Sequence, residues 1–269
     1  MDVTSLTIVL PAYNEEARLG PGLDELFGYL RRSGGGRAGL PGPGALPSDI
    51  TVLVVDDGST DGTEGLVSAR VDATNPARGG SSARGLTLRL LKVPHGGKGA
   101  AVRAGVLESG SDIVVFADAD MATPPDQLPL LTAALREHDL ALGSRIQPDG
   151  RDMRRTQPGY RRALGRLFHL LASVWLVGPV QDTQCGFKGF RGPVARDLFA
   201  MQRVTSIVFD VELIYLARKR GYSMALVPIE WSDRHGSRMR ARPALAMRVL
   251  WDLLRIRFVH RHLPPRSGA

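Results

Sequence analysis

Two carboxylates, Asp118 and Asp120, lie one residue apart in the segment VVFADADMATPP, residues 114–125. The apolar residues before them predict a buried strand, and in a continuing strand both side chains would point to the same face. Two like charges side by side raise each other's free energy unless a cation lies between them or one takes a proton. The segment therefore predicts a divalent-cation site. Its alternative is a solvated strand end with an Asx turn before the two prolines.

A cation held by Asp118 and Asp120 would favour a diphosphate ligand. Mg²⁺ and similar hard cations bind oxygen atoms and often complete their coordination with substrate phosphates. The segment HGGKGAAVRAG, residues 95–105, supports this interpretation, because a glycine-rich turn with Lys98 opens a predicted helix and could direct N–H groups at an anion. It is not a Walker A loop, and its glycines lack dinucleotide-binding spacing. An ordinary strand-to-helix turn explains it equally well.

The segment DDGSTDGT, residues 56–63, also has two interpretations. Its two Asp-Gly pairs are typical of turns, and Ser59 or Thr60 could cap the helix that follows. A carboxylate here could equally accept a hydrogen bond from a nucleobase N–H group or a ribose hydroxyl. Tyr13 could stack on the same base, or it could be a rim aromatic without that role.

The elements that must position these residues alternate between strand and helix. This alternation predicts an α/β fold, with a mostly parallel sheet covered by helices on both faces. Ligands of such sheets bind at the carboxyl ends of the strands. The polar clusters PAYNEE, DDGSTDGT, HGGKG, DADMATPP and GSR all fall at predicted strand ends, which favours one shared site. The predicted strands are residues 6–10, 50–55, 86–93, 112–118 and 140–145, and the predicted helices are residues 15–30, 63–69, 98–109 and 125–138.

The alternation ends after residue 145. Residues 154–178 predict a basic amphipathic helix that runs into an apolar stretch, and residues 207–231 predict a helix followed by a strand. Residues 33–49 and 75–85 are rich in glycine and other turn-forming residues, so they predict surface loops.

The composition limits the classes of protein to which this chain can belong. With 269 residues, 43% of them hydrophobic, the chain can form one large α/β domain or two small ones. Its net charge of +8 favours a polyanionic partner: nucleic acid, an anionic membrane surface or a phosphorylated substrate. The aromatic content is only 6% and there is no nucleic-acid recognition motif, so no nucleic-acid partner is expected. A single cysteine, Cys185, excludes an intrachain disulfide and any cysteine-based metal cluster.

The motifs PAYNEE, VVDDGSTDGT, GKGAAVRAG, DADMATP, GSR and DTQCGFKGF occur in this order along the chain. Together they closely resemble the inverting nucleotide-sugar glycosyltransferases of family 2, which have a GT-A fold. Within that family the sequence is most similar to polyprenyl-phosphate (dolichyl-phosphate-type) β-glucosyltransferases, through DTQCGFKGF, FDVELIYLA and GSRM. The resemblance implies a GT-A domain over residues 1–240, with a nucleotide-sugar half over about 1–120 and an acceptor half over about 121–240, and then a basic amphipathic tail at 241–269.

The resemblance also implies roles for particular residues. Asp118 and Asp120 would hold Mg²⁺ or Mn²⁺ on the donor diphosphate, and Asp120, Arg145 and Asp182 would act in catalysis. Asp182 would either orient the reacting groups or serve as a base. The nucleotide would be bound by Pro11, Tyr13, Glu15, Asp57, Lys98 and Asp118, with Asp56 in support and Ser237 and Arg238 in a late closing loop. The acceptor phosphate would be bound by Arg145, with Arg161 and Arg162 as further candidates.

The implied reaction is a metal-dependent, inverting transfer of a hexose, with glucose favoured, from a donor such as UDP-glucose to a polyprenyl or dolichyl phosphate. The acceptor phosphate would attack the anomeric carbon in line, while the metal stabilises the leaving nucleoside diphosphate. The alternatives are a GDP-mannose-dependent mannosyltransferase and a family 2 enzyme that acts on a soluble acceptor. A nucleotidyltransferase could use the Asp pair but would leave DTQCGFK unexplained.

A lipid acceptor implies contact with a membrane. Residues 160–178 and 243–263 combine arginines with apolar residues, as in helices that lie in a membrane interface, although either could instead pack on the sheet or at a dimer contact. The N-terminus lacks the features of a signal peptide, and no apolar run reaches the ~18 residues of a spanning helix; residues 167–180 come closest. We therefore expect a peripheral protein at the inner, cytoplasmic face of an anionic cell membrane, with a homo-oligomer as a further expectation.

Overall fold

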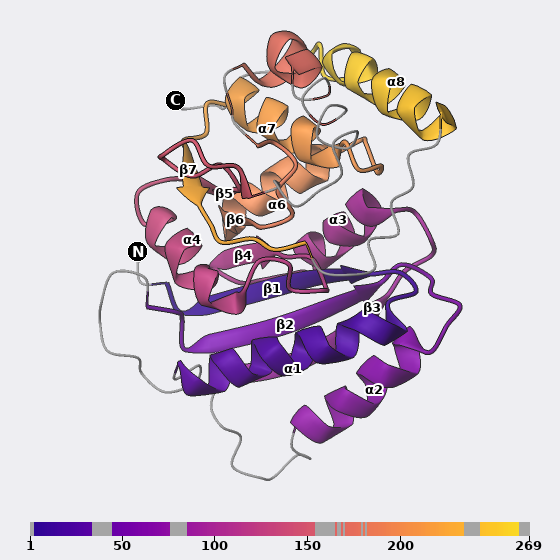
Figure 1. The fold of residues 1–269 in the computed structure, drawn as a ribbon, viewed down its shortest axis with the longest axis vertical. Coiled ribbons are helices and arrows are strands. Elements are labelled where there is room, and N and C mark those ends of the chain that lie inside the picture. The colour runs from indigo at the N-terminus through magenta and orange to yellow at the C-terminus, as the bar shows by residue number, and fades with distance from the viewer. Residues whose placement is uncertain are drawn as a thin grey trace.

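The structure is built on one seven-stranded sheet (Figure 1). The computed structural model describes residues 3–33, 45–75, 85–153, 165, 168, 170–178, 180, 182–233 and 243–263. The strands are β1 (Ser5–Ala12), β2 (Asp49–Asp56), β3 (Leu86–Lys92), β4 (Ile113–Phe116), β5 (Leu140–Ser144), β6 (Lys188–Arg191) and β7 (Met224–Pro228). They lie in the order β3-β2-β1-β4-β6-β5-β7, and every strand pair is parallel except those that involve β6.

Helices cover both faces of this sheet, which confirms the predicted α/β class (Figure 1). The helices are α1 (Glu16–Arg32), α2 (Thr63–Thr74), α3 (Lys98–Glu108), α4 (Leu128–Ala134), α6 (Gly192–Met201), α7 (Phe209–Lys219) and α8 (Pro243–Val259), with short helical turns η1 (Pro125–Gln127) and η3 (Ser173–Val177). Buried residues of α3, α6, α7 and α8 form one core, and those of α1, α2 and α4 form the other. The helix predicted over residues 125–138 is shorter than expected, because η1 opens it and turns follow Ala134.

The alternation of side chains along the strands explains the two cores. In β1, Ile8 and Leu10 belong to the core under α1, whereas Val9 belongs to the core under α3. In β4, Val115 and Phe116 divide between the two faces in the same way. Strands buried on both faces have nearly continuous apolar sequences, which is why these short runs predicted the sheet correctly.

β6 is a strand that the sequence analysis did not predict. It runs antiparallel to both neighbours, β4 and β5. Its amino end therefore lies at the same edge of the sheet as the carboxyl ends of the parallel strands, where Lys188 faces Phe116 in the register. The segment DTQCGFK leads into β6 and for that reason reaches the predicted site edge.

Candidate active site

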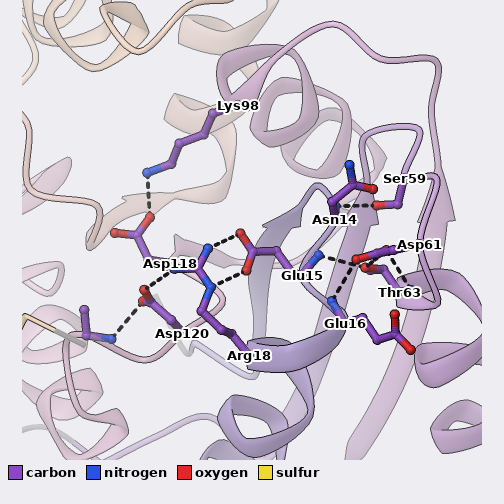
Figure 2. A network of polar contacts seen from close by, with 11 residues as sticks. Asn14, Glu15, Glu16, Arg18, Ser59, Asp61, Thr63, Lys98, Asp118 and Asp120 are labelled. Atoms are coloured by element: carbon purple, nitrogen blue, oxygen red, sulfur yellow. Dashed lines mark hydrogen bonds and ion pairs between the residues drawn. The ribbon is translucent and has the colours of Figure 1, made fainter. Parts of the chain in front are cut away.

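Asp118 and Asp120 lie in a turn directly after β4 and not in a continuing strand. The N–H of Met121 donates to the carbonyl oxygen of Asp118 at 3.1 Å, and Met121 has a φ of +50°. The prediction that strand alternation aligns the two side chains is therefore wrong in its geometry. The turn still brings both carboxylates to the edge where the strands end (Figure 2). Their side chains are 39% and 23% exposed, so both remain accessible.

Two basic side chains offset the negative charge of these carboxylates. Nζ of Lys98 donates to Oδ1 of Asp118 at 2.5 Å, and Nη1 of Arg18 lies 3.5 Å from Oδ2 of Asp120 (Figure 2). Partial burial, and then the charge of Asp118, raise the pKa of Asp120. Burial lowers the pKa of Lys98, but the charges of Asp118 and Asp210 outweigh that effect, so its pKa is raised overall. Acidic and basic groups in contact at one accessible edge suit a diphosphate and its cation.

The carboxylate pair fits a divalent cation that shares its coordination with a substrate. In the part of the chain that the structure describes, no group of three or more Asp, Glu, His or Cys side chains is placed to hold a metal ion. A cation bound by the protein alone, such as structural Zn²⁺ or Ca²⁺, needs more ligands than these two carboxylates supply. Two carboxylates that leave positions for phosphate oxygens and water are the arrangement that Mg²⁺ or Mn²⁺ prefers.

Glu15 reaches this site through Arg18, a residue that the sequence analysis missed. The carboxylate of Glu15 accepts two hydrogen bonds from Arg18, at 2.7 Å from Nε and 2.5 Å from Nη2. Arg18 thereby joins Glu15 to Asp120 (Figure 2). The spacing of three residues on a helix was the available signal, since such pairs face each other. The predicted contact of Glu15 with the nucleotide stays a prediction.

The loop at residues 56–63 is tied to the loop after β1. Ser59 Oγ accepts a hydrogen bond from the N–H of Asn14 at 2.9 Å (Figure 2). Asn14 Oδ1 in turn accepts one from the N–H of Thr60 at 2.7 Å. Asn14 has a φ of +54°, a conformation that asparagine adopts more readily than most residues. The predicted cap on α2 by Ser59 or Thr60 is therefore wrong, because both residues bind Asn14 and the cap position is Gly62.

Asp57 organises the glycine-rich turn before α3. Its buried carboxylate accepts hydrogen bonds from the N–H groups of Gly96 and Gly97 at 2.8 and 2.9 Å, and it lies 2.8 Å from Nδ1 of His95. Gly97 has a φ of +93°, which only glycine adopts without strain. Asp56, at the end of β2, likewise holds its own loop by accepting from the N–H of Ser59 at 3.0 Å. Both predicted nucleotide residues thus position the loops of the site edge.

Tyr13 and His95 form an aromatic pair on the rim. Their ring centroids are 4.2 Å apart and the rings are stacked, while the Tyr13 residue is 42% exposed. An exposed aromatic face offers a stacking surface to a nucleobase. His95 was not predicted as a site residue, and its position beside the predicted phosphate turn was the only signal. Pro11 lies just behind this pair in β1, where it faces Val55 in the register.

Arg145 and Asp182, both predicted to act in catalysis, form a nearly buried ion pair. Asp182 accepts from Nε of Arg145 at 2.8 Å, from Nη2 at 2.5 Å and from its backbone N–H at 2.7 Å. Burial lowers the pKa of Arg145, but the hydrogen bond and charge of Asp182 outweigh it and raise the pKa. Asp182 has a φ of +50°, and the guanidinium of Arg145 lies 5.5 Å from the centre of the Trp231 ring. Such bonding is typical of an orienting carboxylate.

Gly186 connects the segment that contains Asp182 to the carboxylate of Asp118. A Cβ atom at Gly186 would lie 2.6 Å from Cγ of Asp118, closer than real Cβ contacts allow. The absence of a side chain therefore lets the turn after Asp182 pack directly against the carboxylate of Asp118. The sequence analysis took DTQCGFK as a motif but did not identify this glycine.

Four predicted site residues fall outside the described residues: Arg161, Arg162, Ser237 and Arg238. Their roles stay predictions. The described residues divide into two groups, which Gly186 joins. Asp118, Asp120 and Lys98 are called the donor group, and Arg145 and Asp182 the acceptor group, after the roles predicted for them. Two shallow depressions in the described part of the chain lie elsewhere, and neither includes any of these residues.

Comparison with known proteins gives consistent results. The model of the family described as "Glycosyl transferase family 2" matches residues 7–199. A dolichyl-phosphate beta-glucosyltransferase of Trichomonas vaginalis is 36% identical over 259 residues, which cover 93% of this chain and 70% of that protein. The dolichyl-phosphate beta-glucosyltransferase of Drosophila melanogaster is 35% identical over 243 residues, which cover 87% of this chain and 69% of that protein.

Solved structures show the same fold. Glucosyl-3-phosphoglycerate synthase from Mycobacterium tuberculosis in complex with UDP superposes with a TM-score of 0.64 at 20% identity, over 98% of this chain and 82% of that one. The same synthase in complex with Mn²⁺, UDP-glucose and phosphoglyceric acid gives a TM-score of 0.63 at 21% identity, with the same coverage. These likenesses confirm the GT-A fold that the sequence resemblance implies.

Proposed function

Because the chain belongs to glycosyltransferase family 2 and is a glycosyltransferase, we propose that it transfers glucose from UDP-glucose to a polyprenyl phosphate, with inversion at the anomeric carbon. The relatives that share 35–36% of its residues are named for glucosyl transfer to dolichyl phosphate. The observation that carries the proposal is the arrangement of the donor group. Asp118 and Asp120 lie at the strand ends with Lys98 2.5 Å from Asp118, which suits a cation-bound sugar diphosphate.

In this mechanism the donor group acts on the leaving diphosphate. A divalent ion, Mg²⁺ or Mn²⁺, bound by Asp118 and Asp120 would supply charge stabilisation as the glycosidic bond breaks. Lys98 contributes a second positive charge to the same oxygens. Such fixed charges at an accessible protein edge need little reorganisation during the reaction.

The acceptor group positions the attacking phosphate. Nε and Nη2 of Arg145 bind Asp182, so Nη1, at the other edge of the guanidinium, contacts the acceptor phosphate. A phosphate monoester is already largely ionised at neutral pH, since its second pKa is about 6. It therefore needs orientation and shielding from water more than a general base. Asp182 accordingly orients Arg145 and does not remove a proton.

The acceptor is reached at a membrane surface. Exposed apolar side chains gather on η3, on Leu170 and Leu171 just before η3, and on α8, with Val174 80%, Met247 68% and Trp251 64% exposed. The guanidinium of Arg257 lies 5.1 Å from the centre of the Trp175 ring, so the two elements share this surface. No helix in the described part of the chain is long and apolar enough to cross a membrane. Residues 1–240 would thus bind both substrates, and residues 241–269 would contact the anionic cytoplasmic face, where each basic residue contributes roughly 1 kcal/mol.

A soluble phosphorylated acceptor is the second candidate. It is favoured by the solved relative that binds phosphoglyceric acid, although at 21% identity that likeness extends only to the fold. GDP-mannose remains the rival donor, because a stacked Tyr13–His95 pair would accept either base.

The test supplies the wild-type enzyme and Mn²⁺ with labelled UDP-glucose or GDP-mannose, and with a short polyprenyl phosphate or phosphoglyceric acid. We expect labelled lipid from UDP-glucose alone, with a β linkage. Label in phosphoglyceric acid alone would establish a soluble acceptor. Labelled product from GDP-mannose alone would mean that the enzyme transfers mannose and not glucose.

A further inference from the structure

Lys188 and Asp210 form a buried ion pair beneath the candidate active site. Nζ of Lys188 lies 2.7 Å from Oδ1 of Asp210, and the two side chains are 0% and 5% exposed. Lys188 opens β6, and Asp210 lies in the first turn of α7. Burying two charges is unfavourable unless both gain good partners, and an apolar pair of the same size is often as stable. The pair therefore points to a role other than stability.

The second partner of Lys188 is the backbone of the acceptor segment. Its ammonium also donates to the carbonyl oxygen of Cys185 at 2.5 Å. The peptide that carries this oxygen continues into Gly186, which packs against the carboxylate of Asp118. The same turn begins at Asp182, which binds Arg145. Lys188 thus holds a turn that touches both the donor group and the acceptor group.

Asp210 is the ion-pair partner that compensates the buried ammonium of Lys188. The Phe116 ring lies 5.5 Å from Nζ of Lys188, so the pair has apolar surroundings. Charges interact more strongly in such surroundings than in water.

We propose that Lys188 and Asp210 are positioning residues of the transfer, an inference that rests on the proposed function. Lys188 holds the carbonyl of Cys185 so that Gly186 fixes the carboxylate of Asp118. Asp210 orients the ammonium of Lys188 toward that carbonyl. Neither residue touches the donor or the acceptor.

The test compares the full-length wild type with Lys188→Met/Asp210→Leu, with Asp210→Asn and with the control Leu216→Ala. The double variant removes both charges together, with a leucine that keeps the branched shape of Asp210 and a methionine that is one heavy atom shorter than Lys188. Leu216 is a buried residue further along α7, so its truncation lowers stability without reaching the turn. The readouts are thermal unfolding, Mn²⁺ affinity in the presence of UDP, kcat, and the reaction rate of Cys185 with a disulfide reagent.

The double variant should unfold near the wild-type temperature but bind Mn²⁺ with UDP at least tenfold more weakly, and its kcat should fall at least tenfold. Cys185 is buried, and burial followed by the charge of Asp182 raises the pKa of its thiol to about 11. Release of the turn should expose this buried thiol to the reagent and so speed the reaction. Leu216→Ala should lower the unfolding temperature and keep the wild-type Mn²⁺ affinity.

A folded double variant with wild-type Mn²⁺ affinity and wild-type kcat would overturn the inference and leave the pair a purely structural role. If the double variant does not fold, the Mn²⁺ affinity of Asp210→Asn in the presence of UDP provides the test. This substitution removes the charge of Asp210 and keeps the shape of its side chain. A wild type that binds Mn²⁺ and UDP but labels no lipid would refute the proposed function alone, since affinity and thiol reactivity still test the pair.

Discussion

The ammonium of Lys98 lies 2.5 Å from a carboxylate oxygen of Asp118, which joins the start of α3 to the turn after β4. The two residues are 20 positions apart in sequence and belong to different polar clusters. Their contact shows that the motifs HGGKG and DADMATPP, each ambiguous alone, lie together in one site. Under the proposed function, the protonated Lys98 would contact the same phosphate oxygens as the metal held by Asp118.

Replacing Lys98 by methionine should therefore damage catalysis more than stability. Loss of one charge-stabilising donor typically lowers the rate by roughly 100-fold, and we expect kcat/KM for UDP-glucose to fall by about that factor. The side chain is about one third exposed, so the free energy of unfolding should change by less than about 1 kcal/mol. Steady-state kinetics and urea unfolding measure both quantities.

Lys92→Met provides the matched control for that experiment. Lys92 also pairs with a carboxylate, at 2.8 Å from Glu64, but on the exposed surface. It should keep wild-type kinetics. Equal losses in the two variants would mean that Lys98 acts only through general electrostatics.

Gly186→Ala should impair metal binding in a folded protein. The new methyl group would displace the carboxylate of Asp118, which can rotate, so the fold should survive while Mn²⁺ affinity falls at least tenfold. Calorimetric titration with Mn²⁺ and UDP measures the change. Gly65→Ala in α2 is the control, because no atom lies within 4 Å of its added Cβ, and it should stabilise by about 0.4–1 kcal/mol without altering affinity. An unchanged Mn²⁺ affinity in Gly186→Ala would mean that the turn at Gly186 does not contribute to the metal site.

Acid should weaken the anchoring of β1 through Asp112. Its carboxylate accepts hydrogen bonds of 2.9–3.1 Å from the N–H and hydroxyl groups of Thr4 and Ser5, and these bonds lower its pKa. A depressed pKa in the folded state means that the stabilisation is complete above the unfolded value of about 3.9 and is lost as the pH falls through the folded value.

Asp112→Asn should therefore cost about 1 kcal/mol at neutral pH, a figure reduced for solvent exposure, and much less at about pH 3. Urea unfolding of the variant and the wild type at both pH values measures this. A cost that does not depend on pH would contradict the assignment to the charged carboxylate.

Trp251→Ser combined with Phe258→Ser should weaken membrane contact. Both side chains lie on α8 and are more than 60% exposed, so they are free to enter an interface. Burial of each large apolar side chain contributes about 1.5–3 kcal/mol, so partition to anionic vesicles should fall at least tenfold. Co-sedimentation with vesicles measures it. Leu130→Ser is the control, because Leu130 is exposed on α4 outside this surface. Equal effects of the two changes would argue against a specific docking surface.

Much of the sheet could be predicted from local sequence. β1, β2 and β4 are buried on both faces, so their apolar runs appear directly in the chain, and polar clusters mark their ends. β6 could not be predicted in this way. It has only four residues, and its antiparallel pairing with β4 and β5 depends on contacts with strands far away in sequence.

The candidate site shows the same division. The motif residues Asp118, Asp120 and Lys98 were found because their types and spacing indicate a diphosphate and its cation. Arg18 and His95 were missed, because their roles follow from which loops pack together. The burial of Asp57 beneath the glycine turn was also beyond the sequence, since turn-forming and ligand-binding carboxylates have the same local pattern.

The most direct test of the central claim is the transfer of labelled glucose from UDP-glucose to polyprenyl phosphate by the wild type and by Asp118→Asn/Asp120→Asn, each with Mn²⁺ and with a chelator. The amides keep the shape of the carboxylates but bind cations far less well. The account predicts labelled lipid from the wild type with Mn²⁺, and at least a 100-fold loss with chelator or in the variant, which removes the charge stabilisation of the leaving group. Undiminished transfer by the variant, or by the wild type in chelator, would contradict the metal-bound diphosphate on which the account depends.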